Sequence, residues 1–257
     1  MTTPEDHELA ARVATEAGAL LMDLRTRMTA DGAEASVMKD AGDQAAHQFI
    51  METLGAARPD DAILSEEGAD DLARLSAHRT WIVDPLDGTR EYSEPPRVDW
   101  AVHIALVIDG SPVAGAVALP AEGLTLSTAT PPSLPDPRGQ TPRVIVSRTR
   151  RPPAAVNLAK ALEAEYIEMG SAGAKAMAVV RGEADIYAHS GGQYEWDSCA
   201  PVAVATAAGL ACHRLDGSPL VYNNENPYLP DLLICRPEWR DRCLDILAAN
   251  AEADAKG

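Results

Sequence analysis

The chain opens with apolar residues at helical spacing and continues with short apolar runs. Within residues 8–25 an apolar side chain recurs at every third or fourth position, which predicts an amphipathic helix. A second helix is expected over residues 44–54. The runs 62–64 and 81–83 are apolar, short and bounded by polar or turn residues, a pattern typical of buried strands.

Two longer apolar runs, between residues 100 and 120, flank the segment Asp109-Gly110-Ser111-Pro112. An Asp-Gly pair tolerates the positive φ of a tight turn, so the segment predicts a β-hairpin. We interpret residues 1–130 as an N-terminal α+β half whose sheet is at least partly antiparallel. Residues 131–142 are rich in proline, which neither helices nor central strands accept, and we interpret them as a connector.

Beyond the connector, strand-like and helix-like segments alternate over residues 143–257. Strands are expected at 144–146, 166–168 and 184–188, and helices at 154–163, 172–181, 197–208 and 237–250. Such alternation favours an α/β arrangement for this C-terminal half.

The charge of the chain narrows the classes of partner. The formal net charge of -17 argues against nucleic-acid polymers and anionic membranes, because both need a basic surface. A small anionic substrate would need local positive charge. The four cysteines include no C-x-x-C pair and are interpreted as reduced core thiols. The acidic start of the chain and the absence of a long apolar run indicate a cytoplasmic protein. No sequence feature indicates an oligomeric state.

The strongest candidate for chemistry is the run Asp84-Pro85-Leu86-Asp87-Gly88-Thr89, directly after an expected strand. Pro85 fixes its own φ and biases Asp84 toward an extended conformation, and Gly88 permits a sharp turn. Two carboxylates and the Leu86 carbonyl can then converge, and such an all-oxygen set suits magnesium. A surface turn explains the run about equally well, because Asp-Pro and Asp-Gly are common turn pairs.

Two further acidic motifs lie at the ends of expected elements. Ser65-Glu66-Glu67 follows the strand at 62–64, where α/β enzymes tend to place their sites, although a solvated loop is an alternative. Glu195-Trp196-Asp197 precedes an apolar helix, where Asp197 could instead be an ordinary N-cap residue.

These three motifs, in this order, resemble the inositol monophosphatase-like superfamily, which includes fructose-1,6-bisphosphatases and 3′(2′),5′-bisphosphate nucleotidases. The resemblance spans about residues 39–223 and implies the layered αβαβα sandwich of that superfamily. It also implies two or three magnesium ions and inhibition by lithium. The ligands that it implies are Glu66, Asp84, the Leu86 carbonyl, Asp87 and Asp197.

The resemblance further implies three catalytic residues. Asp43 and Thr89 would orient and deprotonate the attacking water, and Glu67 would support the site. The reaction would be a direct in-line displacement at phosphorus with no phosphoenzyme, in which the metals stabilise charge on the attacking and leaving oxygens. From the residues alone, Asp43 can equally cap the helix expected to begin at Gln44.

Weaker motifs concern the substrate. Asp87-Gly88-Thr89-Arg90-Glu91-Tyr92 and Gly170-Ser171-Ala172-Gly173-Ala174-Lys175 resemble CysQ-type nucleotidases more than inositol monophosphatases. This implies hydrolysis of adenosine 3′,5′-bisphosphate to AMP and phosphate in sulfate assimilation. Gly88 and Thr89 would contact the substrate. An inositol phosphate or fructose 1,6-bisphosphate is the alternative within the superfamily.

Three residues are candidates for binding the substrate's anionic groups. A helix beginning near Ser171 would offer N–H groups to an anion, with Lys175 one turn along, although a capped helix with a solvated lysine is the alternative. Arg148 belongs to a small basic cluster suited to a second phosphate, and a solvated loop is equally compatible with it. No residues for a base pocket can be assigned.

Two other classes of protein fit the sequence less well. Phosphatases of the haloacid dehalogenase type carry acids two positions apart after a strand, whereas Asp84 and Asp87 are three apart, and Glu66 would then have no role. A catalytically silent binding homologue is disfavoured because the set of implied ligands and catalytic residues is complete.

Overall fold

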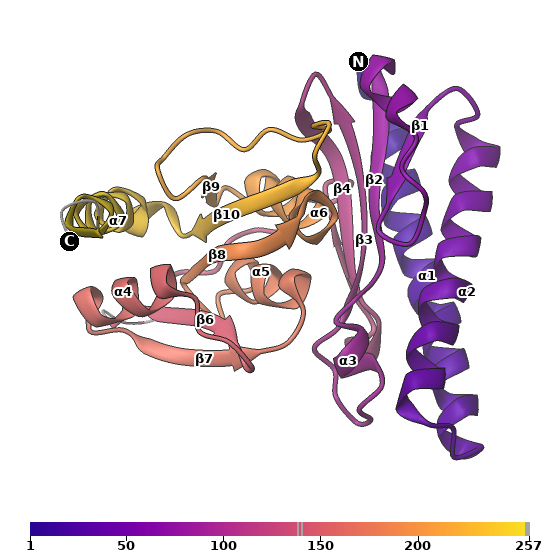
Figure 1. Cartoon of the computed structure of the whole chain (residues 1–257), viewed down its shortest axis with the longest axis horizontal. Helices are drawn as coiled ribbons and strands as arrows, with labels where there is room; N and C mark the ends of the chain where they lie inside the picture. The colour runs from indigo at the N-terminus through magenta and orange to yellow at the C-terminus, as the bar shows by residue number, and fades with distance from the viewer. Residues whose placement is uncertain (138, 140, 255–257) are drawn as a thin grey trace.

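The N-terminal half is a five-stranded sheet covered on one face by two long helices (Figure 1). The computed structural model describes residues 1–254 except 138 and 140. The helices are α1 (Pro4–Ala30) and α2 (Ala35–Ala57). The strands, in sheet order, are β1 (Ala62–Ser65), β2 (Arg79–Asp87), β3 (Ala101–Ile108), β4 (Ser111–Leu119) and β5 (Leu124–Ser127). Three short helices lie in the connections: η1 (Leu72–Ser76), α3 (Thr89–Tyr92) and η2 (Pro120–Glu122).

The strand pairing in this sheet agrees with the expectation, drawn from the sequence, that the sheet is at least partly antiparallel. β1 is parallel to β2, and the β2–β3, β3–β4 and β4–β5 pairs are antiparallel. Asp109 and Gly110 join β3 to β4 with φ values of 51° and 75°, the conformation that a two-residue hairpin turn requires. The expected hairpin is therefore confirmed.

The C-terminal half contains a second five-stranded sheet of order β7-β6-β8-β10-β9. Its strands are β6 (Arg143–Ser147), β7 (Glu165–Met169), β8 (Ile186–Tyr194), β9 (Ala211–His213) and β10 (Tyr228–Cys235). Its helices are α4 (Pro153–Leu162), α5 (Ala172–Val180), α6 (Glu195–Ala207), η3 (Pro237–Trp239) and α7 (Arg240–Asp254). β6 is parallel to β7 and β8, whereas β10 is antiparallel to β8 and β9.

Five layers result, and they confirm the αβαβα sandwich. One hydrophobic cluster joins α1 and α2 to the first sheet. A second places α5 and α6 between the two sheets, and a third packs α4 and α7 on the far face of the second sheet (Figure 1). The chain passes from one sheet to the other between β5 and β6, the interval that contains the proline-rich segment 131–142. Among the described residues, no helix is both long and apolar enough to span a membrane.

Two parts of the sequence interpretation are wrong or incomplete. Helix α2 begins at Ala35 rather than Gln44, because Met38 and Gly42 continue its buried face. Asp43 therefore lies inside the helix and does not cap it. The strands β9 and β10 are not expected from the sequence, since Pro230 and Asp231 interrupt the apolar run of β10, where the pairing with β8 shifts register.

The start of α1 is fixed by an ionic contact to β2. Asp6 is buried, with 1% of its surface exposed. It accepts hydrogen bonds from Arg58 at 2.9 Å and from Arg79, the first residue of β2, at 2.8 Å. Burial alone would raise the pKa of Asp6, but hydrogen bonds from Arg79, the Thr3 backbone and Arg58 hold it well below its ordinary value.

We predict that Asp6→Asn lowers the free energy of unfolding by about 1–3 kcal/mol at pH 7, the range for charge-assisted hydrogen bonds. A lowered folded-state pKa stabilises the fold above the unfolded pKa of about 4, and this contribution disappears as the pH falls. Urea titrations should show the gap between wild type and variant at pH 7 and a smaller gap at pH 3. Asp23→Asn, on the exposed side of α1, is the control. An equal gap at both pH values would contradict this account.

Candidate metal-dependent active site

Asp84 and Asp87 reach the same face of the first sheet because β2 contains a bulge. In a regular strand, residues three apart point to opposite faces. Here Asp84 pairs with His103 and Asp87 with Ala101, so β2 has one residue more than β3 in this interval. A bulge of this kind re-aims a side chain. Both carboxylates are buried, 1% and 7% exposed. Their ligand oxygens lie within 4.8 Å of one another, together with one from Asp197.

The start of α5 holds the Asp87 carboxylate. The Ser171 hydroxyl and the Gly173 N–H donate to Asp87 Oδ2 at 2.5 and 2.6 Å, and the Ala172 N–H donates to Oδ1 at 3.1 Å. Unpaired N–H groups and the helix dipole make a helix N-terminus a site for negative charge. The anion-binding helix start expected from the sequence therefore exists, but the anion that it binds in this structure is Asp87.

His103 on β3 completes this environment. Its Nε2 lies 3.2 Å from Asp87 Oδ2, and its Nδ1 lies 3.0 Å from the Trp196 carbonyl on α6. Burial favours the neutral ring, but the hydrogen bond and charge of Asp87 raise the pKa of His103 above its ordinary value. Gly173 allows the close approach, since a Cβ there would lie 2.0 Å from His103 Nε2.

The result is an ionised carboxylate deep in the protein. Burial would raise the pKa of Asp87, but His103, Lys175 and Ser171 hold it at about 2. Gly88, which follows, has φ 84° and packs against Ser171 and Trp100, where a Cβ would lie 3.1 to 3.2 Å from theirs. The turn after Asp87 thus requires glycine, both for its positive φ and because a Cβ would be crowded there.

Asp197 comes from the first turn of α6. It is the third residue of the helix rather than its N-cap, and its Oδ2 accepts the Tyr194 N–H at 2.7 Å. Burial and the charge of Asp87 raise the pKa of Asp197 to about 6. Burial, Glu66 and Asp87 raise the pKa of Asp84 well above its ordinary value. These carboxylates repel one another, and a divalent cation would let all of them ionise.

Glu66 and Glu67 follow β1 and are exposed. The Glu66 N–H donates to the Val83 carbonyl at 3.3 Å, which continues the parallel pairing toward Asp84. Although Glu66 keeps exposed surface, the protein packed around its carboxyl partly desolvates it. This desolvation and the charge of Asp197 raise the pKa of Glu66 to about 7, whereas a hydrogen bond with Asp84 acts in the opposite direction. The charge of Asp197 thus acts on Glu66, but Glu66 is not among the three residues, Asp84, Asp87 and Asp197, whose oxygens lie within 4.8 Å of one another. Glu67 adds negative charge beside it.

Asp43 and Thr89 are also brought together, across 46 residues of sequence. The Thr89 hydroxyl lies 3.5 Å from Asp43 Oδ1 and donates to the Leu86 carbonyl at 3.1 Å. Burial first, and then the charge of Glu67, raise the pKa of Asp43 to about 7. A carboxyl with this pKa can exchange a proton near neutral pH.

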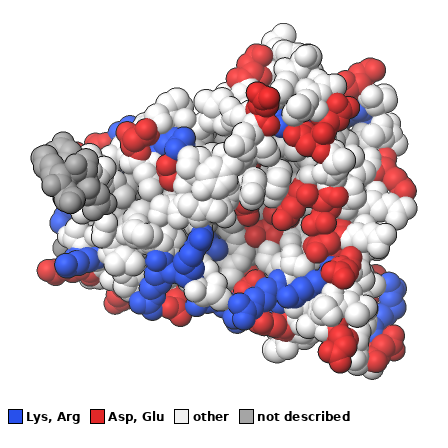
Figure 2. All heavy atoms as spheres, in the orientation of Figure 1, with Lys and Arg blue, Asp and Glu red and all other residues white. Residues whose placement is uncertain are grey.

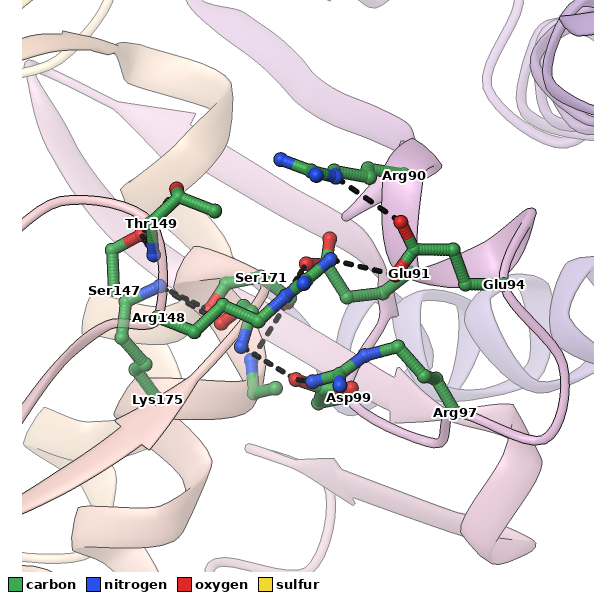
Figure 3. Close-up of polar contacts among 12 residues, drawn as sticks. Arg90, Glu91, Glu94, Arg97, Asp99, Ser147, Arg148, Thr149, Ser171 and Lys175 are labelled. Atoms are coloured by element: carbon green, nitrogen blue, oxygen red, sulfur yellow. Dashed lines mark hydrogen bonds and ion pairs between the residues drawn. The ribbon is translucent and has the colours of Figure 1, made fainter. Parts of the chain in front are cut away.

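Lys175 and Arg148 are engaged by protein groups. Lys175 is 5% exposed, and its Nζ donates to the carbonyls of Gly170 and Ser171 at 2.9 and 2.6 Å. The alternative of a solvated lysine is therefore wrong. Arg148 Nε donates to Glu91 Oε1 at 2.6 Å, and its Nη2 donates to Glu94 at 2.8 Å (Figure 3).

The basic cluster around Arg148 is dispersed. Arg150 Nη2 donates to the Gly191 carbonyl at 2.7 Å, and Arg151 pairs with Glu168 at 2.5 Å. A second contact between the two halves lies next to Arg148, where Asp99 accepts the Gly170 N–H at 2.5 Å and pairs with Arg97 (Figure 3). These contacts fix the strand end that leads into α5.

A buried ionic network on the other side was not expected from the sequence. Arg74 is 1% exposed and donates to Asp70, to the Asn223 side chain at 2.6 Å and to the Asn224 carbonyl at 2.8 Å. The backbone N–H groups of Asn223 and Asn224 donate to the buried Glu195 carboxylate at 2.6 and 2.9 Å. The network connects the loop after Glu66 to the start of α6.

Of the residues missed by sequence reasoning, His103 had a usable signal, since it is a single polar residue inside the apolar strand 101–108. For Arg74 only the pairing with Asp70, four residues away, could have been expected, because Asn223 and Asn224 lie far along the chain. On the face shown in Figure 2, acidic side chains gather where the two halves meet, with basic side chains below them.

Comparison with known proteins gives a family match, two similar curated proteins and one similar crystal structure. Residues 5–244 match the model of the inositol monophosphatase family. The chain is 50% identical over 231 residues to the 3'-phosphoadenosine 5'-phosphate phosphatase of Mycobacterium tuberculosis (strain CDC 1551 / Oshkosh), covering 87% of this chain and 86% of that protein. It is 35% identical over 202 residues to the 3'(2'),5'-bisphosphate nucleotidase CysQ of Escherichia coli (strain K12), covering 74% and 81%. The crystal structure of CysQ from Bacteroides thetaiotaomicron matches with a TM-score of 0.77 and 26% identity, covering 90% and 97%.

We predict that His103→Asn weakens divalent-cation binding about 10-fold or more, the usual effect of removing a hydrogen-bond partner of a metal ligand. The variant removes the imidazole whose Nε2 lies 3.2 Å from Asp87 Oδ2 and compensates for the burial of that carboxylate. Calorimetric titration with Mn²⁺ measures the affinity, and His7→Asn, on α1, is the matched control. Unchanged affinity in a folded His103→Asn protein would show that the imidazole does not support the site.

Proposed function

Because the chain belongs to the inositol monophosphatase family, we propose that it is a metal-dependent phosphatase that hydrolyses 3'-phosphoadenosine 5'-phosphate to AMP and phosphate. The convergence of Asp84, Asp87 and Asp197 on one point carries the reaction class. The mycobacterial phosphatase, similar over most of both chains, supports the choice of substrate.

The residues present fit magnesium. Their donors are carboxylate and carbonyl oxygens, the set that this hard cation prefers. Glu66, Asp84, Asp87, Asp197 and the Leu86 carbonyl would hold two or three ions. When bound, magnesium supplies the positive charge that attracts the phosphate group and stabilises the charge on the attacking and leaving oxygens.

The remaining chemistry falls to Asp43 and Thr89. The Thr89 hydroxyl can donate to Asp43 and accept from a water, which then faces the phosphorus atom. Asp43, whose pKa is raised to about 7 by burial and Glu67, takes the proton of that water through Thr89. A new O–P bond forms as the P–O3′ bond breaks; the 3′ oxygen leaves with the electron pair of that bond and takes a proton from solvent, which gives AMP and phosphate. Glu67 contributes by raising the basicity of Asp43.

Substrate contacts follow from the edges of this site. Gly88 and Thr89 border the cluster and would contact the phosphate that reacts. Ser171 and Lys175 would support Asp87 and not contact the substrate, because Ser171 donates to Asp87 and Lys175, bonded to the Gly170 and Ser171 carbonyls, adds positive charge near it. Arg148 is half-buried and would bind the second phosphate by exchanging Glu94, its more exposed partner, for the ligand.

The proposed function is tested by measuring which phosphorylated substrate the protein prefers. Catalytic efficiency, measured as phosphate release with Mg²⁺, should be at least 10-fold higher for the nucleotide than for inositol 1-phosphate or fructose 1,6-bisphosphate, since one good stacking or charge contact contributes about 1–3 kcal/mol. A preference for either sugar phosphate would leave the family and metal site intact and reject the nucleotide. Chelation of the metal should abolish release from all three.

A further inference from the structure

Three aromatic side chains meet beside Asp197. Tyr194 ends β8, Trp196 lies in the first turn of α6, and Tyr228 begins β10. The rings of Tyr194 and Trp196 are stacked, with centroids 4.9 Å apart and planes at 6°. Tyr228 contacts Tyr194 edge to face at 5.8 Å. We refer to these three residues as the aromatic platform.

The two tyrosines of the platform remain exposed to solvent. Tyr194 is 43% exposed and Tyr228 is 42% exposed. Five other large aromatic residues of the chain are almost completely buried: Trp81, Tyr92, Trp100, Tyr187 and Tyr222. Trp196 is partly buried against the central core and anchors the platform. Core packing therefore accounts for Trp196 but not for the exposed area of the tyrosines, which is available to a planar ligand.

The platform is attached to the metal site through its backbone. The Tyr194 N–H donates to Asp197 at 2.7 Å, and the Trp196 carbonyl lies 3.0 Å from His103 Nδ1. A ligand whose phosphate lies at Asp197 would therefore have the rest of its structure within reach of Tyr194.

A turn at Gly191 and Gly192 places polar groups at the edge of the aromatic platform. The Gly192 N–H donates to the Tyr228 hydroxyl at 3.1 Å, and Arg150 holds the Gly191 carbonyl at 2.7 Å. The exposed Arg150 places a positive charge at this turn, next to the glycine whose N–H contacts the Tyr228 hydroxyl. A flat aromatic surface suits the planar base of a nucleotide better than the polyhydroxyl ring of an inositol or a fructose.

We propose that the aromatic platform binds the adenine base of the substrate, with Tyr194 as its stacking surface and thus a residue that determines specificity. The proposal rests on the proposed function, since it needs a substrate that carries a base. Base stacking on aromatic side chains is general, because every base has a π face. Trp196 and Tyr228 hold the Tyr194 ring in place and so reduce the entropy lost on binding.

The test compares inhibition by AMP with inhibition by inorganic phosphate, which has no base. Tyr194→Leu should raise the inhibition constant of AMP and the Michaelis constant of the nucleotide substrate roughly 5- to 150-fold, the range that corresponds to the loss of one stacked base. Inhibition by phosphate should stay unchanged. Tyr194→Phe, which keeps the ring, should resemble wild type. Tyr166→Leu, at an exposed tyrosine of β7, is the matched control.

Two variants and the wild-type activity together show whether Tyr194 stacks on the base. Equal effects of Tyr194→Leu on AMP and phosphate, or no effect on either, would overturn the proposal. Tyr228→Leu, which leaves Tyr194 and Trp196 intact, should give a smaller change of the same kind and serves if Tyr194→Leu does not fold. If wild type does not hydrolyse the nucleotide, the proposed function fails, and direct titration of wild type and Tyr194→Leu with AMP still measures the stacking.

Discussion

The buried Asp87 carboxylate joins the two halves of the molecule at the acidic cluster. Its strand belongs to the first sheet, whereas its hydrogen-bond donors begin α5, in the second half. The α5 N-terminus and His103 make it possible to bury this charge, which would otherwise be unfavourable by several kcal/mol. Because α5 and α6 lie between the sheets, the same contact brings Asp197 to Asp84. The acidic cluster is therefore a consequence of how the layers pack.

This arrangement explains why an acidic protein can act on a phosphate ester. The cluster concentrates negative charge in a small volume, and the raised pKa values of Asp84, Asp197 and Glu66, caused first by burial, show how strongly it disfavours full ionisation. Divalent cations remove that repulsion and reverse the local charge. The site is thus complementary to its substrate only when cations are bound, whereas recognition of the base would depend on the aromatic platform.

Much of this could be predicted from the sequence. The spacing of apolar residues and the Asp-Gly turn predict most of the helices and strands. The three acidic motifs indicate the acidic cluster. The bulge in β2 could not be predicted, because alternation alone sends Asp84 and Asp87 to opposite faces. Neither could the role of Ser171, since its partner Asp87 is 84 residues away. The local sequence pattern shows which N–H and hydroxyl groups a helix start offers, whereas only tertiary packing determines which anion binds to them.

We propose that Asp84, Asp87 and Asp197, with Glu66, form one multinuclear cation site. Anomalous diffraction from crystals grown with Mn²⁺ measures this directly. We predict two or three manganese peaks coordinated by oxygens of these four residues and by the Leu86 carbonyl. Crystals that bind manganese elsewhere, or that leave these carboxylates without a peak at millimolar Mn²⁺, would contradict it.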